Sequence, residues 1–367
     1  MNKLKNYVEY VSDRISVKDL DETNYIGVDN LVPNRGGICT AEYVPEDGYV
    51  TKFIVGDILL GNIRPYFKKI WLAEFEGGAS PDVLVLRPFH NNDSKFVYAV
   101  MSQDSFFDYD MAGSKGSKMP RGDKNHILEY PVIEIKNRDE IGKLINNIDR
   151  KIKINNRIND NLQQQLELSF NYYFNNPLTS KSWSSGVLSD IATITMGQSP
   201  SGDSYNDNGK GIPFYQGSTD FGSFFPTIRM YTTAPSRMAD ELDTLLSVRA
   251  PVGTMNISFE KCCIGRGLAA IQGNNGNNIF VRYLLKRNQW YFDNINNSGT
   301  TFGSITKDHL YKMPITVPDD TSVKAFEDNA KTLEYRIYNN EKEIRTLSSL
   351  RNWLLPMLMN GQATISD

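Results

Sequence analysis

A glycine-rich loop at residues 112–124 carries basic side chains at regular intervals. Basic side chains bind phosphate groups, and glycine lets the backbone approach a phosphate closely because it has no side chain. We therefore expect this loop to contact nucleic acid, although a flexible, solvated loop is compatible with the same composition. The basic residues of the loop are Lys115, Lys118, Arg121 and Lys124.

A second loop, at residues 299–307, is less basic but rich in hydroxyl groups that can donate hydrogen bonds. Farther upstream lies a turn-rich segment whose glutamine can read adenine by paired hydrogen bonds. Loops without any contact to a ligand explain the same residues. The candidate donors are Thr300, Thr301, Ser304 and Lys307 in the loop, and Tyr215, Gln216 and Ser218 in the upstream segment.

Two arginines, Arg64 and Arg249, lie near predicted strand ends that lead into a proline. An arginine there suits bidentate contact with guanine or phosphate, and a structural ion pair that shapes the turn is the alternative. Lys68 and Lys69 follow two aromatic residues. That alternation suits contact with a nucleic-acid backbone and fits the edge of a solvated hairpin equally well.

No combination of residues points to catalysis or to a bound metal. His126 and His309 have no cysteine or carboxylate at a spacing that indicates chemistry, so we expect packing or helix capping for both. The three cysteines indicate neither a metal site nor a disulfide framework. Asp82 and Glu134 faintly match a metal-dependent nuclease signature, which we interpret as chance. The phosphate-binding loop of ATP-driven motors is absent from the sequence.

The elements that must position these residues occur twice. Residues 116–135 resemble residues 299–318 at an offset of 183, and residues 56–65 match residues 242–251 at an offset of 186. A repeat this long indicates two copies of one domain rather than a short-period solenoid. Internal two-fold repetition suits a partner with approximate two-fold symmetry, and duplex DNA is such a partner.

Each half is expected to mix strands and helices. Residues 52–61 and 82–89 are short runs rich in Val, Ile and Leu, and they predict strands. Apolar residues at helical spacing predict one helix over residues 96–111 and a matching helix over residues 278–292.

Each half is followed by a long helix with a heptad pattern, at residues 139–174 and 320–355. With about 36 residues at 1.5 Å each, such a helix is roughly 54 Å long. The two helices can pair as an antiparallel coiled coil whose seam asparagines fix the register. The predicted seam consists of Ile145, Ile148, Ile152, Asn155 and Leu162 in the first helix and of Leu333, Ile337, Asn340, Ile344 and Leu347 in the second.

The overall charge limits the size of any nucleic-acid face. The formal net charge is −3, so a contact surface must be local, made from a few basic loops on a near-neutral body. The N-terminal residues do not form a secretory signal, and no run of 18 apolar residues exists. With the unpaired cysteines, these features predict a cytoplasmic protein that does not enter a membrane.

The ordered set of motifs resembles the specificity subunit of bacterial type I restriction–modification enzymes, over essentially the whole chain. The two halves differ widely outside these motifs, so we expect them to read different half-sites. The stretches that carry the resemblance are LLGNIRPYFKKIWLAEFEGGASPDVLVLRP (59–88), LLSVRAPVGTMNIS (245–258), IGRGLAAIQ (264–272) and SGTTFGSITKDHLYKMPITVP (298–318).

The resemblance implies an α+β fold. Two α/β target-recognition domains would be joined by two long antiparallel coiled-coil helices, with a pseudo-two-fold internal repeat. The expected boundaries are 1–135 for the first recognition domain, 136–176 for the first helical region, 177–318 for the second recognition domain and 319–367 for the second helical region.

The resemblance also implies a non-catalytic subunit that reads a bipartite, asymmetric site in double-stranded DNA, one half per domain. Its partners would be two methyltransferase subunits, which carry S-adenosylmethionine and modify adenine, and restriction subunits that use ATP and magnesium. The chain itself would hold no cofactor. A stand-alone nuclease, which predicts metal-dependent cleavage abolished by Asp82→Ala, is one alternative. A coiled-coil adaptor, which predicts no salt-dependent DNA binding, is the other.

Overall fold

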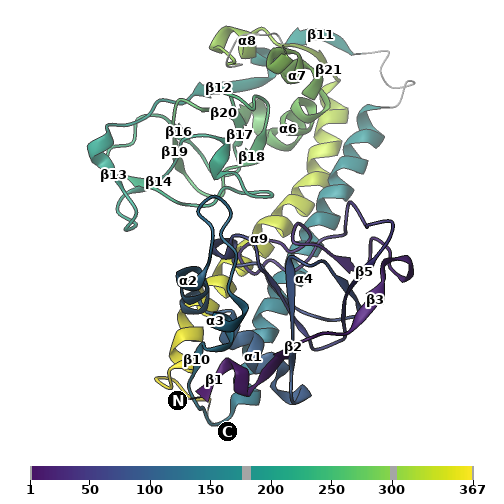
Figure 1. Ribbon diagram of the computed structural model, residues 1–367. Coiled ribbons are helices and arrows are strands. Elements are labelled where there is room, and N and C mark those ends of the chain that lie inside the picture. Colours follow the sequence, from purple (N-terminus) through teal and green to yellow (C-terminus); the bar gives the residue numbers. More distant parts are fainter. Residues whose placement is uncertain (1, 176–182, 298–303, 366–367) are drawn as a thin grey trace. The chain divides into compact units, whose positions relative to one another are not determined.

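The computed structural model describes residues 2–175, 183–297 and 304–365 of the chain (Figure 1). These residues form two compact units, each a mixture of helices and strands. The first unit consists of Met1–Arg157 together with Asn340–Asp367, and the second consists of Ile158–Asn339.

Two four-stranded sheets build the first unit. The central strands β6 (Ile58–Gly61) and β9 (Val83–Pro88) are apolar and almost wholly buried, as expected where both faces of a sheet are covered. The strand predicted at 82–89 is confirmed by β9. One sheet has the order β2 (Val8–Tyr10), β9 (Val83–Pro88), β6 (Ile58–Gly61), β7 (Ile70–Leu72), and the other β3 (Arg14–Ser16), β5 (Tyr49–Phe53), β8 (Gly77–Ala79), β4 (Tyr25–Ile26).

The single strand predicted over residues 52–61 is wrong, because β5 and β6 are separated by a tight turn. Asp57 is buried, and its Oδ2 accepts a hydrogen bond of 2.9 Å from the backbone N–H of Ile54. Gly56 takes a left-handed φ of +94° in the same turn. Both oxygens of Asp57 also accept from Arg87 of β9 at 2.8 Å, which ties the turn to the sheet.

The helix predicted over residues 96–111 is two helices, α1 (Ser94–Met101) and α2 (Asp104–Gly113). Gln103 is extended, with φ −70° and ψ 148°, so the chain changes direction between them. Their aromatic side chains fill the main core of the unit. The remaining elements are α3 (Lys124–Leu128), the β1 (Asn2–Lys3) and β10 (Pro131–Val132) pair, and the short helices η1 (Leu4–Asn6), η2 (Val17–Asp19), η3 (Pro65–Phe67) and η4 (Asn91–Asp93).

The second unit has a four-stranded antiparallel sheet and a separate five-stranded sheet. Cys262 and Cys263 lie fully buried in an interior strand of the larger sheet. The smaller sheet has the order β12 (Ala192–Met196), β20 (Leu268–Gly273), β17 (Thr244–Ser247), β18 (Met255–Ile257), and the larger β13 (Tyr205–Asn206), β15 (Tyr231–Thr232), β14 (Ile212–Tyr215), β19 (Cys262–Ile264), β16 (Met238–Ala239).

The helix predicted over residues 278–292 is also two helices, α6 (Asn278–Arg287) and α7 (Gln289–Asn297). Asn288 ends α6, and its side chain donates a hydrogen bond of 2.9 Å to the carbonyl of Leu284. The other elements are α5 (Leu188–Ile191), α8 (Lys307–Tyr311), the β11 (Ser184–Val187) and β21 (Pro314–Val317) pair, and the short helices η6 (Gly202–Ser204), η7 (Ser218–Asp220) and η8 (Asn274–Gly276).

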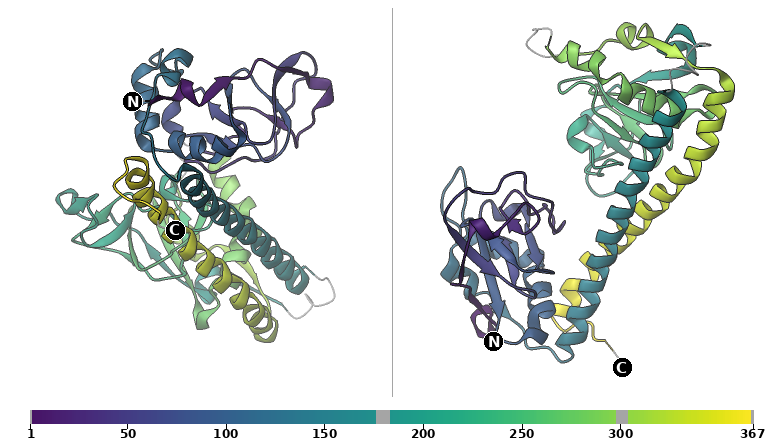
Figure 2. Two further views of the ribbon diagram at one scale, coloured as in Figure 1. Left: turned by 90° about the horizontal axis from the view of Figure 1, so that it is seen from below. Right: turned by 90° about the vertical axis from the view of Figure 1, so that its right-hand side faces the viewer.

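Two long helices, α4 (Arg138–Phe174) and α9 (Asp320–Met359), contribute a part to each unit, and within each unit they run side by side (Figure 2). In the first unit Arg351 pairs with Asp149 at 2.7 Å. In the second, Phe170 and Phe174 pack on Phe326, with ring centroids 5.6 and 5.5 Å apart.

The predicted seam residues differ in burial. Asn155 donates a hydrogen bond of 2.7 Å to Glu343, which also pairs with Lys151, and these partners hold the pKa of Glu343 below its usual value. The buried seam residues are Ile145, Ile148, Asn155, Leu162 and Ile337, and the half-buried ones are Ile152, Leu333, Asn340, Ile344 and Leu347.

Candidate nucleic-acid interface

The basic loop of the first unit is fixed at the end of strand β6. The backbones of Lys115 and Arg121 exchange two hydrogen bonds of 2.9 Å, which close the loop. Arg64, just beyond β6, donates its N–H to the carbonyl of Pro120 at 2.8 Å, and Ile63 forms an antiparallel bridge with Arg121. The structure therefore brings the predicted residues Arg64, Lys115 and Arg121 together in one place.

The cations of this loop differ in how they are paired. Lys115 contacts Asp123 at 2.6 Å, although its side chain is 81% exposed, and Arg121 contacts Asp82 at 3.1 Å. Lys124 lies over the ring of Tyr10 at 5.5 Å. Lys118 is exposed and forms no ion pair within the described residues. Lys118 is thus the loop cation whose charge is most available to a phosphate.

Asp123 fixes the end of the loop. Its side chain accepts hydrogen bonds from the backbones of Asn125 and His126 and so caps α3. The hydrogen bond from Lys115 and these backbone donors lower the pKa of Asp123 to about 2. The carboxylate therefore stays charged near neutral pH and keeps both its contact with Lys115 and its cap on α3.

A buried carboxyl group lies beneath the loop. Asp110 is fully buried, and neither of its oxygens has a hydrogen-bond partner among the described residues. A side chain at Gly122 would come within 2.4 Å of Asp110 and 2.9 Å of Asn62, so only glycine fits between them. Burial raises the pKa of Asp110 to about 7, and nearby His126 offsets part of that rise.

The other predicted cations of the first unit turn inward. Lys68 contacts Asp104 at 2.6 Å, and Lys69 donates to the carbonyl of Val28 at 2.7 Å. The Nε atom of Arg64 is buried and has no acceptor within the part of the chain that the structure describes. The charges of Lys68 and Lys69 are therefore used within the unit, and the Arg64 side chain is half-buried.

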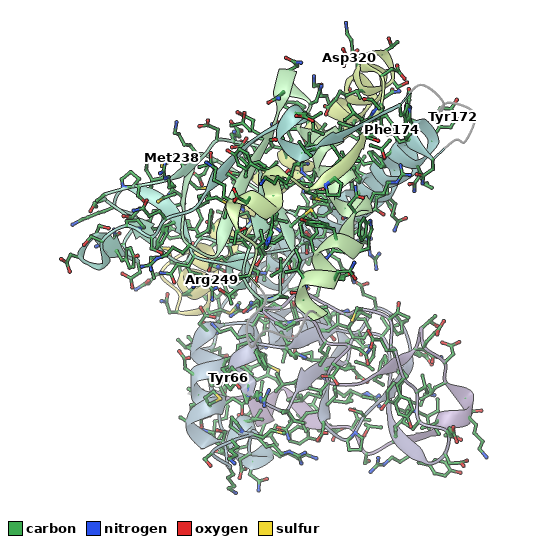
Figure 3. The ribbon with its side chains drawn as sticks, turned by 90° about the horizontal axis from the view of Figure 1, so that it is seen from above. Tyr66, Tyr172, Phe174, Met238, Arg249 and Asp320 are labelled. Carbon is green, nitrogen blue, oxygen red and sulfur yellow. The ribbon has the colours of Figure 1, made fainter. Side chains whose placement is uncertain are left out.

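In the second unit a chain of backbone hydrogen bonds brings separate loops together. Gly267 donates to the carbonyl of Gln216 at 3.2 Å, Val248 donates to Gly267 at 2.9 Å, and Ile305 donates to Val248 at 2.9 Å. Three predicted residues, Gln216, Arg249 and Ser304, follow or flank these contacts, and all three are exposed. Arg249, labelled in Figure 3, also forms an antiparallel bridge with Ser304.

The remaining predicted residues of this unit lie in different settings. Tyr215 is buried, Ser218 begins η7 and is half-buried, and Lys307 begins α8 with its ammonium group 4.8 Å from the ring centroid of Tyr311. Thr300 and Thr301 lie outside the described residues. Lys307 lies three residues after Ser304, at the start of α8.

Sequence reasoning missed Arg266, which lies between the contacts just described. It is exposed, and it is flanked by Gly265 and Gly267. A side chain at position 267 would come within 2.4 Å of the carbonyl of Gln216, so the close approach requires glycine. The signal in the sequence is the Gly-Arg-Gly triplet, because glycines on both sides let the backbone around an arginine approach another loop closely.

His126 and His309 have structural roles, as expected. His126 stacks on Tyr109 with ring centroids 4.0 Å apart, and its Nε2 lies 3.0 Å from the carbonyl of the same residue. His309 takes part in the capping of α8 with Thr306. Within the described residues no group of three or more His, Cys, Asp or Glu could hold a metal ion. None of the described helices is both long enough and apolar enough to cross a membrane.

Comparison with known proteins gives a consistent result. Residues 180–344 match the family model of the type I restriction modification DNA specificity domain. The putative type I restriction enzyme MjaX specificity subunit of Methanocaldococcus jannaschii is 26% identical over 404 aligned residues, which span 100% of this chain and 93% of that protein.

Two solved structures align with nearly the whole chain. The S subunit of a type I restriction–modification system from M. genitalium aligns with a TM-score of 0.60 at 15% identity, covering 100% of this chain and 96% of that one. The HsdS subunit from Thermoanaerobacter tengcongensis is 22% identical, with 99% and 96% covered and a TM-score of 0.36. The TM-score of 0.60 shows that the two chains share a fold. The family match and the similar specificity subunit confirm the resemblance predicted from the sequence.

Proposed function

Because residues 180–344 belong to the type I restriction modification DNA specificity domain family and the whole chain is similar to specificity subunits, we propose that this protein selects the DNA sequence on which a type I restriction–modification complex acts. Each unit reads one half of a bipartite, asymmetric site in double-stranded DNA. The first unit uses the loop of Lys115, Lys118 and Arg121. The second uses the edge formed by Gln216, Arg249, Arg266 and Ser304.

One observation carries this proposal beyond the family match. In each unit the residues after a central strand form a bridge with the loop that precedes the last small helix. In the first unit the bridge joins Ile63, after β6, to Arg121, before α3. In the second unit it joins Arg249, after β17, to Ser304, before α8. The bridge holds exposed donors at a fixed place on a folded frame. Base edges in the major groove are read by donors held in this way, while other contacts fix the position on the backbone.

We further propose that α4 and α9 pair as an antiparallel coiled coil that joins two recognition domains with pseudo-two-fold symmetry and sets the spacing of the half-sites. The long helices also offer exposed apolar side chains, which suit the docking of helices from a partner. These side chains are Ile154, Leu168, Tyr172, Tyr335 and Trp353.

The chemistry in this proposal belongs to other subunits. Two methyltransferase subunits bind S-adenosylmethionine and modify adenine, and restriction subunits use ATP and magnesium. This chain contributes DNA recognition and assembly, without catalysis and without a cofactor of its own. Its three free cysteines, Cys39, Cys262 and Cys263, fit a cytoplasmic protein.

The test is to co-express the chain with the methyltransferase subunit encoded beside it and to map methylated adenines across the genome by long-read sequencing. We expect a split, asymmetric motif that disappears when the chain is omitted. Substitutions confined to one unit should alter one half of the motif and leave the other intact. Methylation that is independent of this chain, or a motif without a gap, would contradict the proposal.

A further inference from the structure

An aromatic pair faces outward beside the basic loop of the first unit. Tyr66 and Phe67 are 48% and 37% exposed, and their ring centroids lie 4.7 Å apart. Both belong to η3, and Tyr66 is labelled in Figure 3. Single exposed apolar side chains are common, but two adjacent rings that contact each other form a continuous apolar surface.

The turn that carries the pair is held in an uncommon conformation on both sides. Arg64 and Lys68 flank η3, and both take left-handed φ values, 52° and 53°, which non-glycine residues rarely adopt. Backbone N–H groups from a separate loop secure it: Asn34 donates to the carbonyl of Phe67 at 2.8 Å, and Arg35 to that of Lys68 at 2.9 Å. Strain that a structure holds in place this firmly often marks a functional site.

The cations around the turn serve to hold it. Lys68 and Arg35 both bind the carboxylate of Asp104, and Arg35 also lies over the ring of Phe107 at 5.5 Å. Lys69 donates to a backbone carbonyl of the unit. The ammonium groups of Lys68 and Lys69 are therefore bound within the unit, while the two aromatic rings are exposed. If the lysines made the DNA contacts, the ammonium groups would be exposed instead.

The position of the pair favours nucleic acid as its ligand. The N–H of Arg64 binds the carbonyl of Pro120, so η3 adjoins the loop that carries Lys118 and Arg121. Met119 of that loop is a further apolar side chain, 49% exposed. Apolar side chains surrounded by cations suit a duplex, because the cations bind phosphates while the apolar groups insert between stacked bases.

We propose that Tyr66 and Phe67 form a wedge that stacks on bases of the half-site read by the first unit and opens one base step there. This inference rests on the proposed function and deepens it, because sequence preference then includes how easily that step unstacks. Arg64, Lys68 and Lys69 are positioning residues for the wedge. They hold the turn, and the rings contact the DNA.

The wedge is confined to the first half-site. In the sequence repeat, the stretch after Pro65 corresponds to the stretch after Pro251. There the second unit has Val252, which is buried, and Gly253, which carries no side chain. The two half-sites are therefore read by different means, one through deformation and one through exposed polar groups alone.

The test uses the complex of the full chain with its methyltransferase subunit and a duplex of the motif found by methylation mapping. 2-Aminopurine replaces single bases along each half-site in turn. Because a methyltransferase flips its target adenine out of the duplex, the target adenines are left unsubstituted. At the remaining positions we expect a rise in fluorescence at one base step of the first half-site when the wild-type complex binds, and no rise in the second. The variant Tyr66→Ala/Phe67→Ala should lose that rise and bind about 10- to 100-fold more weakly, with an unchanged dependence on salt.

Control variants separate the possible causes. Tyr66→Phe keeps the ring and should keep the signal, and Tyr49→Ala removes a tyrosine that is 72% exposed elsewhere in the unit and should change nothing. Equal binding and equal fluorescence in wild type and double variant would overturn the wedge. Loss of the methyltransferase subunit from the double-variant complex would overturn it too, because the pair would then be a protein contact. A wild-type complex without sequence preference would overturn the proposed function itself.

Discussion

Arg249 and Ser304 form an antiparallel bridge that the first unit reproduces with Ile63 and Arg121. The two pairs are related by the offsets of 186 and 183 residues found in the sequence. In the second unit the arginine of the bridge, Arg249, follows the central strand. In the first unit the arginine, Arg121, lies on the other side of the bridge, in the loop before the last small helix. Two units with one frame and different exposed side chains suit the reading of two different half-sites.

Arg249 and Arg266 should contribute to DNA affinity without contributing to stability. Arg249 forms no ion pair within the described residues, and its turn is held by the Ser247 hydroxyl, which donates to the Arg249 carbonyl at 2.7 Å. Replacing either arginine with alanine should weaken DNA binding by about 1–3 kcal/mol if it reads a base. Melting temperature should be unchanged in both, whereas Ser247→Ala should lower it. A destabilised Arg249→Ala would instead favour a structural role.

Lys118 and Lys69 provide a matched comparison of two lysines in one unit. Lys118→Ala removes an exposed, unpaired charge. The slope of the logarithm of the DNA-binding constant against the logarithm of the salt concentration should therefore become shallower by about one. Lys69→Met removes an ammonium group that binds Val28 and should lower stability with little change in the slope. Binding measured by fluorescence anisotropy from 50 to about 200 mM salt distinguishes them. An unchanged slope in Lys118→Ala would remove this loop from the interface.

Charges placed on the predicted seam should destabilise the long helices in proportion to burial. Ile337 is buried, so Ile337→Asp should lower the free energy of unfolding by about 3 kcal/mol or more. Ile152 is half-buried, so Ile152→Asp should lower it by less. Ile154, which is 45% exposed, provides a control whose change to Asp should stay within about 0.5 kcal/mol. Denaturation gives the free energy of unfolding, and methylation mapping gives the spacing. If Ile152→Asp and Ile337→Asp left the spacing unaltered, the helices would not set it.

Breaking the buried ion pair of the second unit should destabilise the protein strongly, whereas replacing both partners with apolar residues should change its stability little. Arg282 binds Glu334 and also donates to Thr244 at 3.2 Å and to the carbonyl of Leu242 at 3.1 Å. Arg282→Ala leaves a buried carboxylate unpaired and should cost about 3–5 kcal/mol, whereas Arg282→Met with Glu334→Leu should come close to wild type. The exposed Lys261–Asp240 pair provides the control. Equal losses in the single and double variants would show that the pair is not the stabilising element.

Asp110 should make the first unit less stable as the pH rises. Its pKa is about 7 when folded and near 3.8 when exposed, so the folded state retains a proton that the unfolded state loses. The resulting cost is absent below about pH 4, grows between about pH 4 and 7 and is constant above, at up to roughly 4 kcal/mol. Asp110→Asn should raise stability at pH 8 and leave it unchanged at pH 4. A parallel pH profile for both proteins would contradict this.

The sequence predicted the two long helices and the strand at 82–89 at their correct places because a heptad pattern or an apolar run extends over many residues. It failed at short interruptions. The turn at Asp57 and the break at Gln103 depend on one side chain or one extended residue, and neither disturbs the apolar pattern. Local hydrogen bonding therefore decided the element boundaries that periodicity alone did not define.

The candidate site was predicted in part, for a related reason. Residue type identified Lys118, Arg121 and Arg249, but it did not distinguish a cation that points outward from one that binds its own unit. Lys69 and Lys118 look alike in a sequence, and only the tertiary contacts separate them. Contacts between residues far apart in the chain, such as the approach of Gly267 to Gln216, were likewise hidden.

The first unit is built from two separate stretches of the chain, and this affects the order in which the units can fold. Leu355, Leu358 and Met359 of α9 lie in the same core as Phe96 of α1, and Asn137 donates a hydrogen bond to the carbonyl of Ile365. A ribosome delivers residues 158–339 before these last residues emerge. The second unit can therefore complete its core during synthesis, while the first unit must wait until residues 340–365 have been made.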